Sequence, residues 1–201
     1  MSISTYAELK TAVANWLHRS DLTDEIPDLI TLGEKWIFRH ARTRDMETAL
    51  SVAISSGVAA VPSDYVEMKH AYIDGTPTSQ IRRQSASQIY ARYPTRSADG
   101  RPQFFARDGS NFIFGPYPDS NYTIKGIYYK RLDAVSSSAN ALFVSAPDLY
   151  LFAALCEAEP FLKHDKRIPV WTAKRNLALD DVNGEDNDET YSGGPIAMVP
   201  A

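Results

Sequence analysis

The sequence of 201 residues predicts an α+β fold, a helical bundle built from N- and C-terminal helix pairs with an inserted β-rich module. Three observations lead to this prediction. Apolar residues recur at helical spacing towards both ends of the chain, residues 46–131 alternate with the period of strands, and no internal repeat is evident. Strands that are segregated from helices along a chain favour α+β over a doubly wound α/β fold.

The first helix pair of the bundle is predicted within residues 1–45. Thr5 and Glu8 form a capping-box pattern in front of an amphipathic helix over about 5–18. A second helix is expected to begin near Pro27, which suits a first-turn position. Basic residues occupy the last turns of this second helix, where they complement the negative end of the helix dipole. A short loop between the two helices is typical of an αα-hairpin.

The β-rich module is predicted over residues 46–131. Asp74-Gly75 and Asp108-Gly109 each lie between two short apolar runs and indicate two hairpins. The run after Gly57 is interpreted as the return of the first strand. The expected strands are 48–54, 58–61, 65–73, 78–81, 104–106, 111–114 and 122–130, with a short helix over 87–93.

The second helix pair is predicted over residues 141–183, after a linker at 132–140. Polar residues are absent for eight positions within the first of these helices, so we expect this helix to be surrounded on most sides. Pro160 is expected to kink it. The last helix is predicted over about 167–182, around Ile168, Trp171, Leu177 and Val182.

The net charge of −4 hides an uneven distribution of charged residues. The chain holds 21 basic and 25 acidic residues, and six of the acidic ones lie in residues 180–201, which contain no Lys or Arg. Residues 1–179 therefore carry 21 basic and 19 acidic residues, a net charge of +2. Residues 184–201 are predicted to form a flexible acidic tail with an apolar end at 195–200 that docks on a partner.

The chain shows no motif for catalysis, metals or cofactors. One cysteine, Cys156, provides neither a disulfide framework nor a cysteine-based zinc site, and the four histidines are isolated from one another. No glycine-rich phosphate loop and no nucleophile elbow is present. We therefore expect no enzyme, no cofactor and no metal. A small enzyme whose site is assembled from distant residues stays an open alternative to which no motif points.

Targeting signals are also missing from the sequence. No apolar run reaches the roughly 18 residues that a membrane-spanning helix needs. The first ten residues lack the basic start and the apolar core of a signal peptide. We therefore expect a protein that is made and used in a reducing, cytosol-like space.

Aromatic and basic residues interleave in the middle of the chain. Such a pattern suits a stacking platform for single-stranded nucleic acid, a β-sheet core with basic edges, or a protein interface. The acidic overall charge favours the sheet core over the platform. The residues concerned are Arg82, Arg83, Tyr90, Arg92, Tyr93, Arg96, Arg101, Phe104, Phe105, Arg107, Tyr128, Tyr129, Lys130 and Arg131.

Five segments, in their order along the chain, resemble tailed-bacteriophage head-to-tail adaptor (connector) proteins. They are TYAEL at 5–9, SDLTDEIPDLI at 20–30, RTRDME at 42–47, PDLYLFAAL at 147–155 and EPFL at 159–162. Each motif alone is weak, and their order is more specific. The likeness covers residues 1 to about 182 and includes the succession of helices, strands and helices, whereas the acidic tail and the apolar end have no clear counterpart.

This resemblance implies a structural virion protein of the head-tail junction, made in the host cytoplasm. It would pack beside copies of itself, usually twelve, in a closed ring that links the portal protein to the tail or nozzle protein. Genomic DNA would pass through the lumen without sequence readout, and no membrane would be involved. The residues expected to bind partners are Arg39, Arg42, Arg44, Asp186, Asp188, Tyr191, Ile196, Met198 and Val199.

A second class of function stays open beside the adaptor. The Arg/Tyr-rich middle of the chain would suit a nucleic-acid-binding or DNA-packaging accessory protein. Salt-sensitive DNA binding by the isolated monomer would favour this second class. Ring formation on a portal protein would favour the adaptor.

Overall fold

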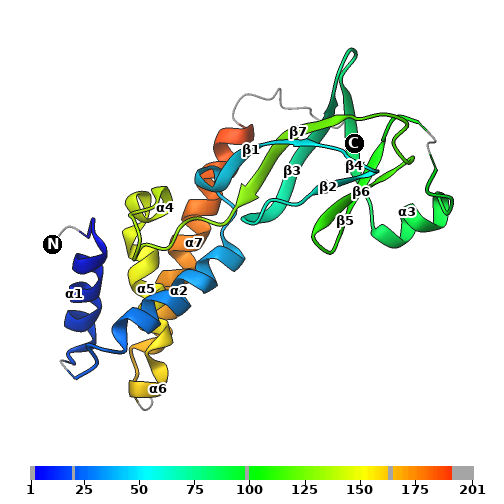
Figure 1. Cartoon of the computed structure of the whole chain (residues 1–201). Coiled ribbons are helices and arrows are strands. Elements are labelled where there is room, and N and C mark those ends of the chain that lie inside the picture. The colour runs from blue at the N-terminus through cyan, green and yellow to red at the C-terminus, as the bar shows by residue number, and fades with distance from the viewer. Residues whose placement is uncertain (1–2, 20, 98–99, 163–164, 192–201) are drawn as a thin grey trace, which may run out of the picture. The chain divides into compact units, whose positions relative to one another are not determined.

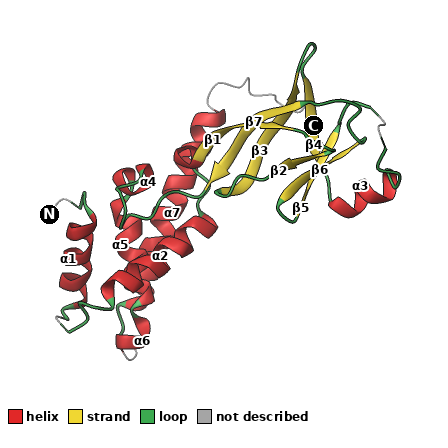
Figure 2. Cartoon of the chain, viewed as in Figure 1, coloured by secondary structure: helices red, strands yellow, loops and turns green. Residues whose placement is uncertain are grey.

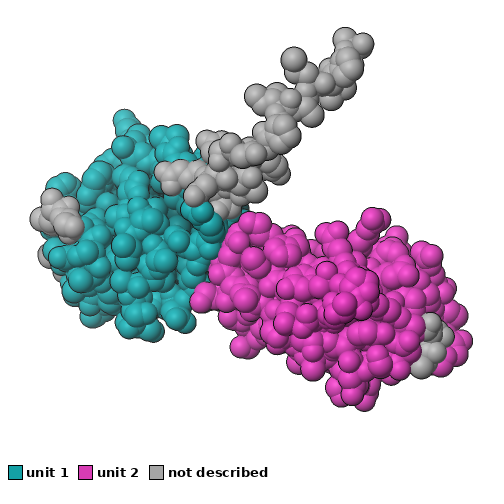
Figure 3. Space-filling view, turned by 90° about the horizontal axis from the view of Figure 1, so that it is seen from above, with its two compact units in different colours: residues 1–45, 132–201 teal, residues 46–131 magenta. Residues whose placement is uncertain are grey.

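The computed structural model describes residues 3–19, 21–97, 100–162 and 165–191. The chain forms two compact units, which Figure 3 shows in different colours. One unit, here called the helical unit, comprises residues 1–45 and 132–201, and the other, the β unit, comprises residues 46–131. Every described strand belongs to the β unit (Figure 2).

The helical unit is built around one buried helix. Its α5 is buried at every position from Leu149 to Leu155, and α1, α2 and α7 all pack against it (Figure 1). The expectation that this apolar helix is surrounded on most sides is confirmed. The helices of the unit are α1 (Tyr6–Leu17), α2 (Ile26–His40), α4 (Ala141–Ser145), α5 (Pro147–Glu157), α6 (Glu159–Leu162) and α7 (Ile168–Tyr191).

A glycine sets the spacing between α2 and α5. A Cβ atom on Gly33 would lie 2.9 Å from the backbone nitrogen of Ala154 and 3.0 Å from the carbonyl carbon of Ala153. Real Cβ atoms do not approach backbone atoms so closely, so only glycine permits this packing of α2 on α5. The apolar stripe of α2 is thereby held against the most buried helix of the unit.

Residues 132–140 are fixed to the helical unit by buried polar groups. The Glu34 carboxylate, 4 % exposed, accepts a hydrogen bond from the backbone N–H of Val135 at 2.7 Å. The side chain of Asn140 donates to the carbonyl of Asp133 and accepts from the Phe143 N–H and the Tyr150 hydroxyl. These contacts join the segment to α2, α4 and α5.

The β unit is a seven-stranded sheet with the strand order β1-β7-β3-β4-β5-β6-β2. Its strands are β1 (Glu47–Ala53), β2 (Val58–Ala60), β3 (Tyr65–Asp74), β4 (Ser79–Arg83), β5 (Phe104–Asp108), β6 (Asn111–Gly115) and β7 (Thr123–Lys130). A 3-10 turn, η1 (Arg44–Met46), precedes β1, and α3 (Ala86–Arg92) lies between β4 and β5. All pairs are antiparallel except β4 with β5.

The sheet curls into a near-barrel around an apolar core. Its two edge strands, β1 and β2, are consecutive in sequence and meet through a tight turn. In this turn Ser55 and Val58 exchange two backbone hydrogen bonds of 2.8 and 3.1 Å. Phe112 and Phe114 are fully buried inside the curl, together with Ile73. The β unit therefore has a hydrophobic core of its own.

The predicted fold class is wrong. The structure is a mixed α+β protein with a seven-stranded near-barrel sheet, and not the predicted helical bundle with an inserted β-rich module. The periodicity of apolar residues identified the strands but not how the sheet curls into a near-barrel. Because the sheet curls, residues 46–131 enclose a hydrophobic core of their own and form a separate compact unit. The short helices α4 and α6 were not predicted as separate elements.

The predicted return strand after Gly57 also differs from the structure. β2 pairs with β6 and meets β1 only at the Ser55–Val58 bridge. Ser56 and Gly57 have positive φ angles of 51° and 73°, which turn the chain sharply. The chain therefore moves from one edge of the sheet to the other instead of folding back along β1.

Helix α7 is longer than expected. It was predicted to end near residue 182, and its backbone continues as helix to Tyr191. Residues 184–191 of the predicted flexible tail are therefore helical, and residues 192–201 lie outside the described residues. In the described part of the chain, no helix combines the length and the hydrophobicity that crossing a membrane requires.

Candidate functional site

The described residues offer little that resembles a reaction centre. Among them, no group of three or more His, Cys, Asp or Glu side chains is arranged to hold a metal ion. Cys156 is half-buried, and burial raises the pKa of its thiol, while its sulfur lies 3.6 Å from the Thr172 hydroxyl. A thiol with a raised pKa is a weak nucleophile, which agrees with a packing role.

Exposed apolar side chains are the distinctive feature of the helical unit. Within the described residues, six of the seven large hydrophobic side chains that are exposed belong to this unit. They are Trp16, Leu32, Val144, Phe161, Val170 and Leu177. Such residues are common on surfaces that bind other proteins when they gather into patches.

One patch is a groove, which we call the α1–α5 groove. It has a volume of about 510 Å³. Trp16 packs edge-to-face on Phe152 at a ring distance of 5.6 Å, yet it stays 43 % exposed. Val144 is 66 % exposed. The groove is lined by Ile3, Ser4, Trp16, Val144, Pro147, Asp148, Leu151 and Phe152.

A second patch lies on α7, and we call Val170, Ala173 and Leu177 the α7 stripe. These residues recur at intervals of three and four and so share one face of the helix. All three are exposed, Val170 by 55 % and Leu177 by 62 %. The opposite face of α7 holds the buried Trp171 and Ala178. The stripe therefore points away from the core of its own unit.

The predicted basic residues lie where α2 ends. Arg39 is exposed in the last turn of α2, and Arg44 is exposed in η1. The backbone N–H of Arg42 donates to the side-chain oxygen of Asn183 at 3.0 Å. Its guanidinium donates to the carbonyl of Ala41 at 2.6 Å. The structure thus brings the end of α2 beside the acidic part of α7.

The remaining predicted partner-binding residues belong to the C-terminal part of the chain. Asp186, Asp188 and Tyr191 lie in the last turns of α7, where the structure describes the backbone alone. Ile196, Met198 and Val199 lie outside the described residues. Asn183, one turn before Asp186, is the residue that joins this region to the end of α2.

Arginines of the Arg/Tyr-rich middle stack on aromatic rings of their own unit. The Arg96 guanidinium lies 5.6 Å from the ring centre of Tyr90 and 5.0 Å from that of Tyr117. It also donates to the carbonyl of Phe114 at 2.8 Å. Arg92 lies over both Tyr93 and Phe104. In each of these pairs an arginine occupies a ring face on which a nucleobase could stack, and Tyr90 stays 42 % exposed.

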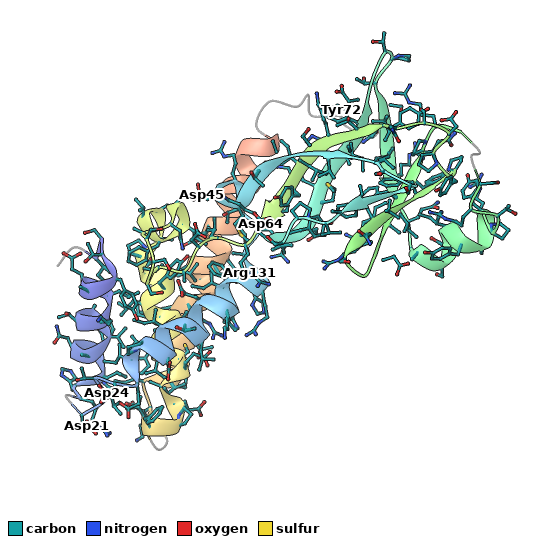
Figure 4. The ribbon with its side chains drawn as sticks, in the orientation of Figure 1. Asp21, Asp24, Asp45, Asp64, Tyr72 and Arg131 are labelled. Carbon is teal, nitrogen blue, oxygen red and sulfur yellow. The ribbon has the colours of Figure 1, made fainter. Side chains whose placement is uncertain are left out.

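Other members of the Arg/Tyr-rich set belong to the sheet core. Phe105 and Tyr128 are buried inside the near-barrel. The Tyr128 hydroxyl donates to Asp64 at 3.0 Å, and burial together with this hydrogen bond raises the pKa of Tyr128 to about 12. The backbone of Arg131 also donates to Asp64, and Figure 4 labels both residues. For these residues the sheet-core interpretation is correct.

Two exposed residues of the candidate patches, Trp16 and Leu177, are apolar residues of predicted helices. Trp16 follows Leu9 by seven positions and shares its helix face, so spacing gives no sign of its exposure. Leu177 lies six residues after Trp171, which places the two on different faces of a helix. That spacing is a signal from which the exposed face of α7 could have been inferred.

The fold and its surfaces define a two-unit α+β protein with apolar surfaces suited to binding other proteins. The sequence model of the SU10 adaptor protein family matches residues 4–198. The chain belongs to this family of phage head-to-tail adaptors, which confirms the resemblance found in its segments. It is therefore a bacteriophage adaptor protein and a component of the virion that interacts with other virion components. No curated protein matches the chain.

Proposed function

We propose that this chain is a structural head-to-tail adaptor that assembles as a ring, links the portal protein to the tail or nozzle protein and lines the DNA channel. The observation that carries the proposal is the family match over residues 4–198, which includes both units and all of α7. The role is structural rather than catalytic. Twelve copies, the number usual for such rings, form the assembly at the head-tail junction.

The exposed apolar surface of the helical unit supports a ring. A closed ring of identical subunits needs two different surfaces on each copy, because each subunit meets one neighbour with one surface and the next neighbour with the other. The α1–α5 groove and the α7 stripe are two such surfaces. An isolated adaptor exposes them to water, and assembly buries them.

The charge distribution supports a channel through which DNA passes without being read. A net charge of +2 over residues 1–179 is low for a protein that grips the phosphate backbone. The stacking of Arg92 and Arg96 on neighbouring rings further reduces what the β unit offers to bases. The nucleic-acid-binding alternative is accordingly the weaker of the two.

The end of α2 and the C-terminal segment are the proposed contacts with the portal protein. The basic residues Arg39, Arg42 and Arg44 suit acidic side chains of a partner. The segment that contains Asp186, Asp188 and Tyr191 and then Ile196, Met198 and Val199 combines charge with an apolar end. Deletion of residues 185–201 is expected to abolish binding to the portal while α1–α5 stay folded. Unchanged portal binding would exclude this role of the segment.

A phage that lacks the gene for this protein tests the proposed function. We expect it to make heads and tails that do not join, and we expect the purified protein, when added to the lysate, to restore infective particles. Electron microscopy of the lysate distinguishes the outcomes. Complete particles made without the protein would contradict the proposal.

A further inference from the structure

We propose that residues 196–199 pair as an added strand with the free edge of β1 in the same chain, before the protein meets its partners. The free edge is the side of β1 that faces away from β7. Among the described residues, a second strand meets this side only at the Ser55–Val58 bridge, which follows the last residue of β1. The inference goes beyond the adaptor function, because it concerns the isolated chain.

β1 carries backbone groups that lack a hydrogen-bond partner. All seven of its residues are in register with β7, beside which it lies in Figure 1. In an antiparallel pair, alternate residues direct their N–H and C=O groups to the partner strand, and the others direct them outwards. The hydrogen bonds found within the described parts of the chain give these outward groups no partner. An added strand would satisfy them.

The free edge lacks the features by which proteins protect an open sheet edge. Such features are short strands, bulges, prolines and lysines. The register of β1 is unbroken, and Ala49, Ser51 and Ala53 present small uncharged side chains on its exposed face. By contrast, β2 at the other edge of the sheet has three residues and is followed closely by Pro62. β1 is therefore suited to strand addition, and β2 is not.

The C-terminal segment suits this edge in composition and in charge. Ile196-Ala197-Met198-Val199 is an apolar run between two prolines, with a β-branched residue at each end. No charged side chain follows Glu189 in the sequence. The one charged residue of β1, Glu47, is already paired with Lys69. Strand addition thus leaves no charge without a partner.

The connections of the chain allow this contact within one copy. The Arg42 N–H donates to Asn183 of α7, and β1 begins five residues after Arg42, a span of at most about 17 Å. From Asn183 to Tyr191, α7 rises about 12 Å. The end of α7 and the start of β1 are therefore separated by no more than about 35 Å. Residues 192–199 span up to about 28 Å, which covers most of this maximal distance.

The added strand would have two consequences for the isolated protein. It keeps the free edge from pairing with the same edge of a second copy. It also holds on the β unit the segment that is proposed above to contact the portal protein. Portal binding then releases residues 196–199 from β1.

Hydrogen exchange of the isolated full chain tests the pairing. The double variant Ala197→Pro with Met198→Pro removes two adjacent N–H groups, one of which faces β1 in either register. We expect amides of β1 to exchange at least about tenfold faster in this variant than in the wild type, and amides of β2 to be unchanged. Ala197→Val with Met198→Leu is the matched control, which keeps both N–H groups and is expected to behave as the wild type does.

Two results of this experiment would overturn the inference. One is equal exchange of β1 in the proline variant and in the wild type. The other is protection of β1 that develops only after the portal protein is added, because the edge would then belong to the portal. Both experiments on this pairing begin with the protein alone, so their failure leaves the adaptor function standing.

Cysteine cross-linking of dilute protein decides whether the added strand comes from the same chain. In a Cys156→Ala background, Ser51→Cys is combined with Ala197→Cys, and a short bis-maleimide is added. We expect a cross-link within one chain, identified by mass spectrometry of its peptides. Gln80→Cys with Ala197→Cys is the control, because Gln80 is exposed on the interior strand β4, and should cross-link at least about tenfold less. Cross-links that join two chains would assign the edge to a second copy and overturn the inference.

Discussion

Gly33 is a single residue on which the packing of α2 against α5 depends. A Cβ atom would meet backbone atoms of Ala153 and Ala154, which cannot turn aside as a flexible side chain does. We expect Gly33→Ala to destabilise the helical unit by about 1–3 kcal/mol. Thermal unfolding followed at 222 nm measures the change.

Gly184 provides the matched control for Gly33. It also lies in a helix, but a Cβ atom there would meet no atom within 4 Å. Gly184→Ala is therefore expected to stabilise α7 by about 0.5–1 kcal/mol, through the lower backbone entropy of alanine. Equal effects of the two substitutions would contradict the close approach of α2 and α5.

Glu34 is a buried acid whose contribution to stability depends on pH. Burial raises the pKa of this carboxyl above its ordinary value of 4.5, although the Val135 N–H opposes the rise. The folded protein then binds the proton more tightly than the unfolded chain. Stability therefore falls as pH rises from about 4.5 through the folded pKa. Above that range the buried charge is a continuing cost.

Two substitutions of Glu34 separate the charge from the hydrogen bond. Glu34→Gln keeps an acceptor for the Val135 N–H and removes the charge, so we expect higher stability than wild type at neutral pH and a smaller difference in acid. Glu34→Ala leaves a buried N–H unpaired and is expected to cost about 1–3 kcal/mol. Urea unfolding at a series of pH values checks both. If the difference in stability between Glu34→Gln and the wild type did not change with pH, the assignment of a buried, destabilising charge to Glu34 would be refuted.

At the scale of the element, α1 depends on its capping box. Thr5 accepts a hydrogen bond from the Glu8 N–H at 3.2 Å, and the Glu8 carboxylate accepts one from the Thr5 N–H at 3.0 Å. We expect Thr5→Ala to cost about 1 kcal/mol of stability. Thr11→Ala is the control, because the Thr11 hydroxyl bonds only back to the Ala7 carbonyl inside the helix. Its effect should be near zero or slightly stabilising.

Local signals predicted most elements of this fold. The capping box at Thr5, the proline at the start of α2 and the turns at Gly75 and Gly109 each act within a few residues, so spacing and residue type suffice to recognise them. The helices α1 and α2, both hairpins and β7 accordingly lie where they were expected. Helix α3 also matches its prediction to within one residue at each end.

The sequence pattern could not predict which strands pair over long distances in the chain. β2 pairs with β6, more than fifty residues away, and β4 runs parallel to β5 across the α3 segment. The local alternation of apolar residues shows that a segment is a strand, but it does not show with which other strand that segment pairs. The same limit applies to the candidate surfaces. The exposure of Trp16 results from the place where α1 meets α5, which no spacing within α1 encodes.

At the scale of the whole molecule, we expect weak contact with nucleic acid. Residues 1–179 carry a net charge of only +2, and several arginines of the β unit stack on its own rings. We expect fluorescence anisotropy with labelled single-stranded DNA to show no binding by the isolated protein at physiological salt. Tight binding that weakens steeply with salt would support the nucleic-acid-binding alternative.

The central claim is that this adaptor becomes a ring when it meets its portal protein. Native mass spectrometry of the purified protein, alone and after mixing with the portal, measures this directly. We expect a single chain of 22.4 kDa when the protein is alone. With the portal protein we expect a complex that contains a closed set of adaptor copies, twelve by the expectation for this family. A complex with a single adaptor copy, or no complex at all, would contradict it.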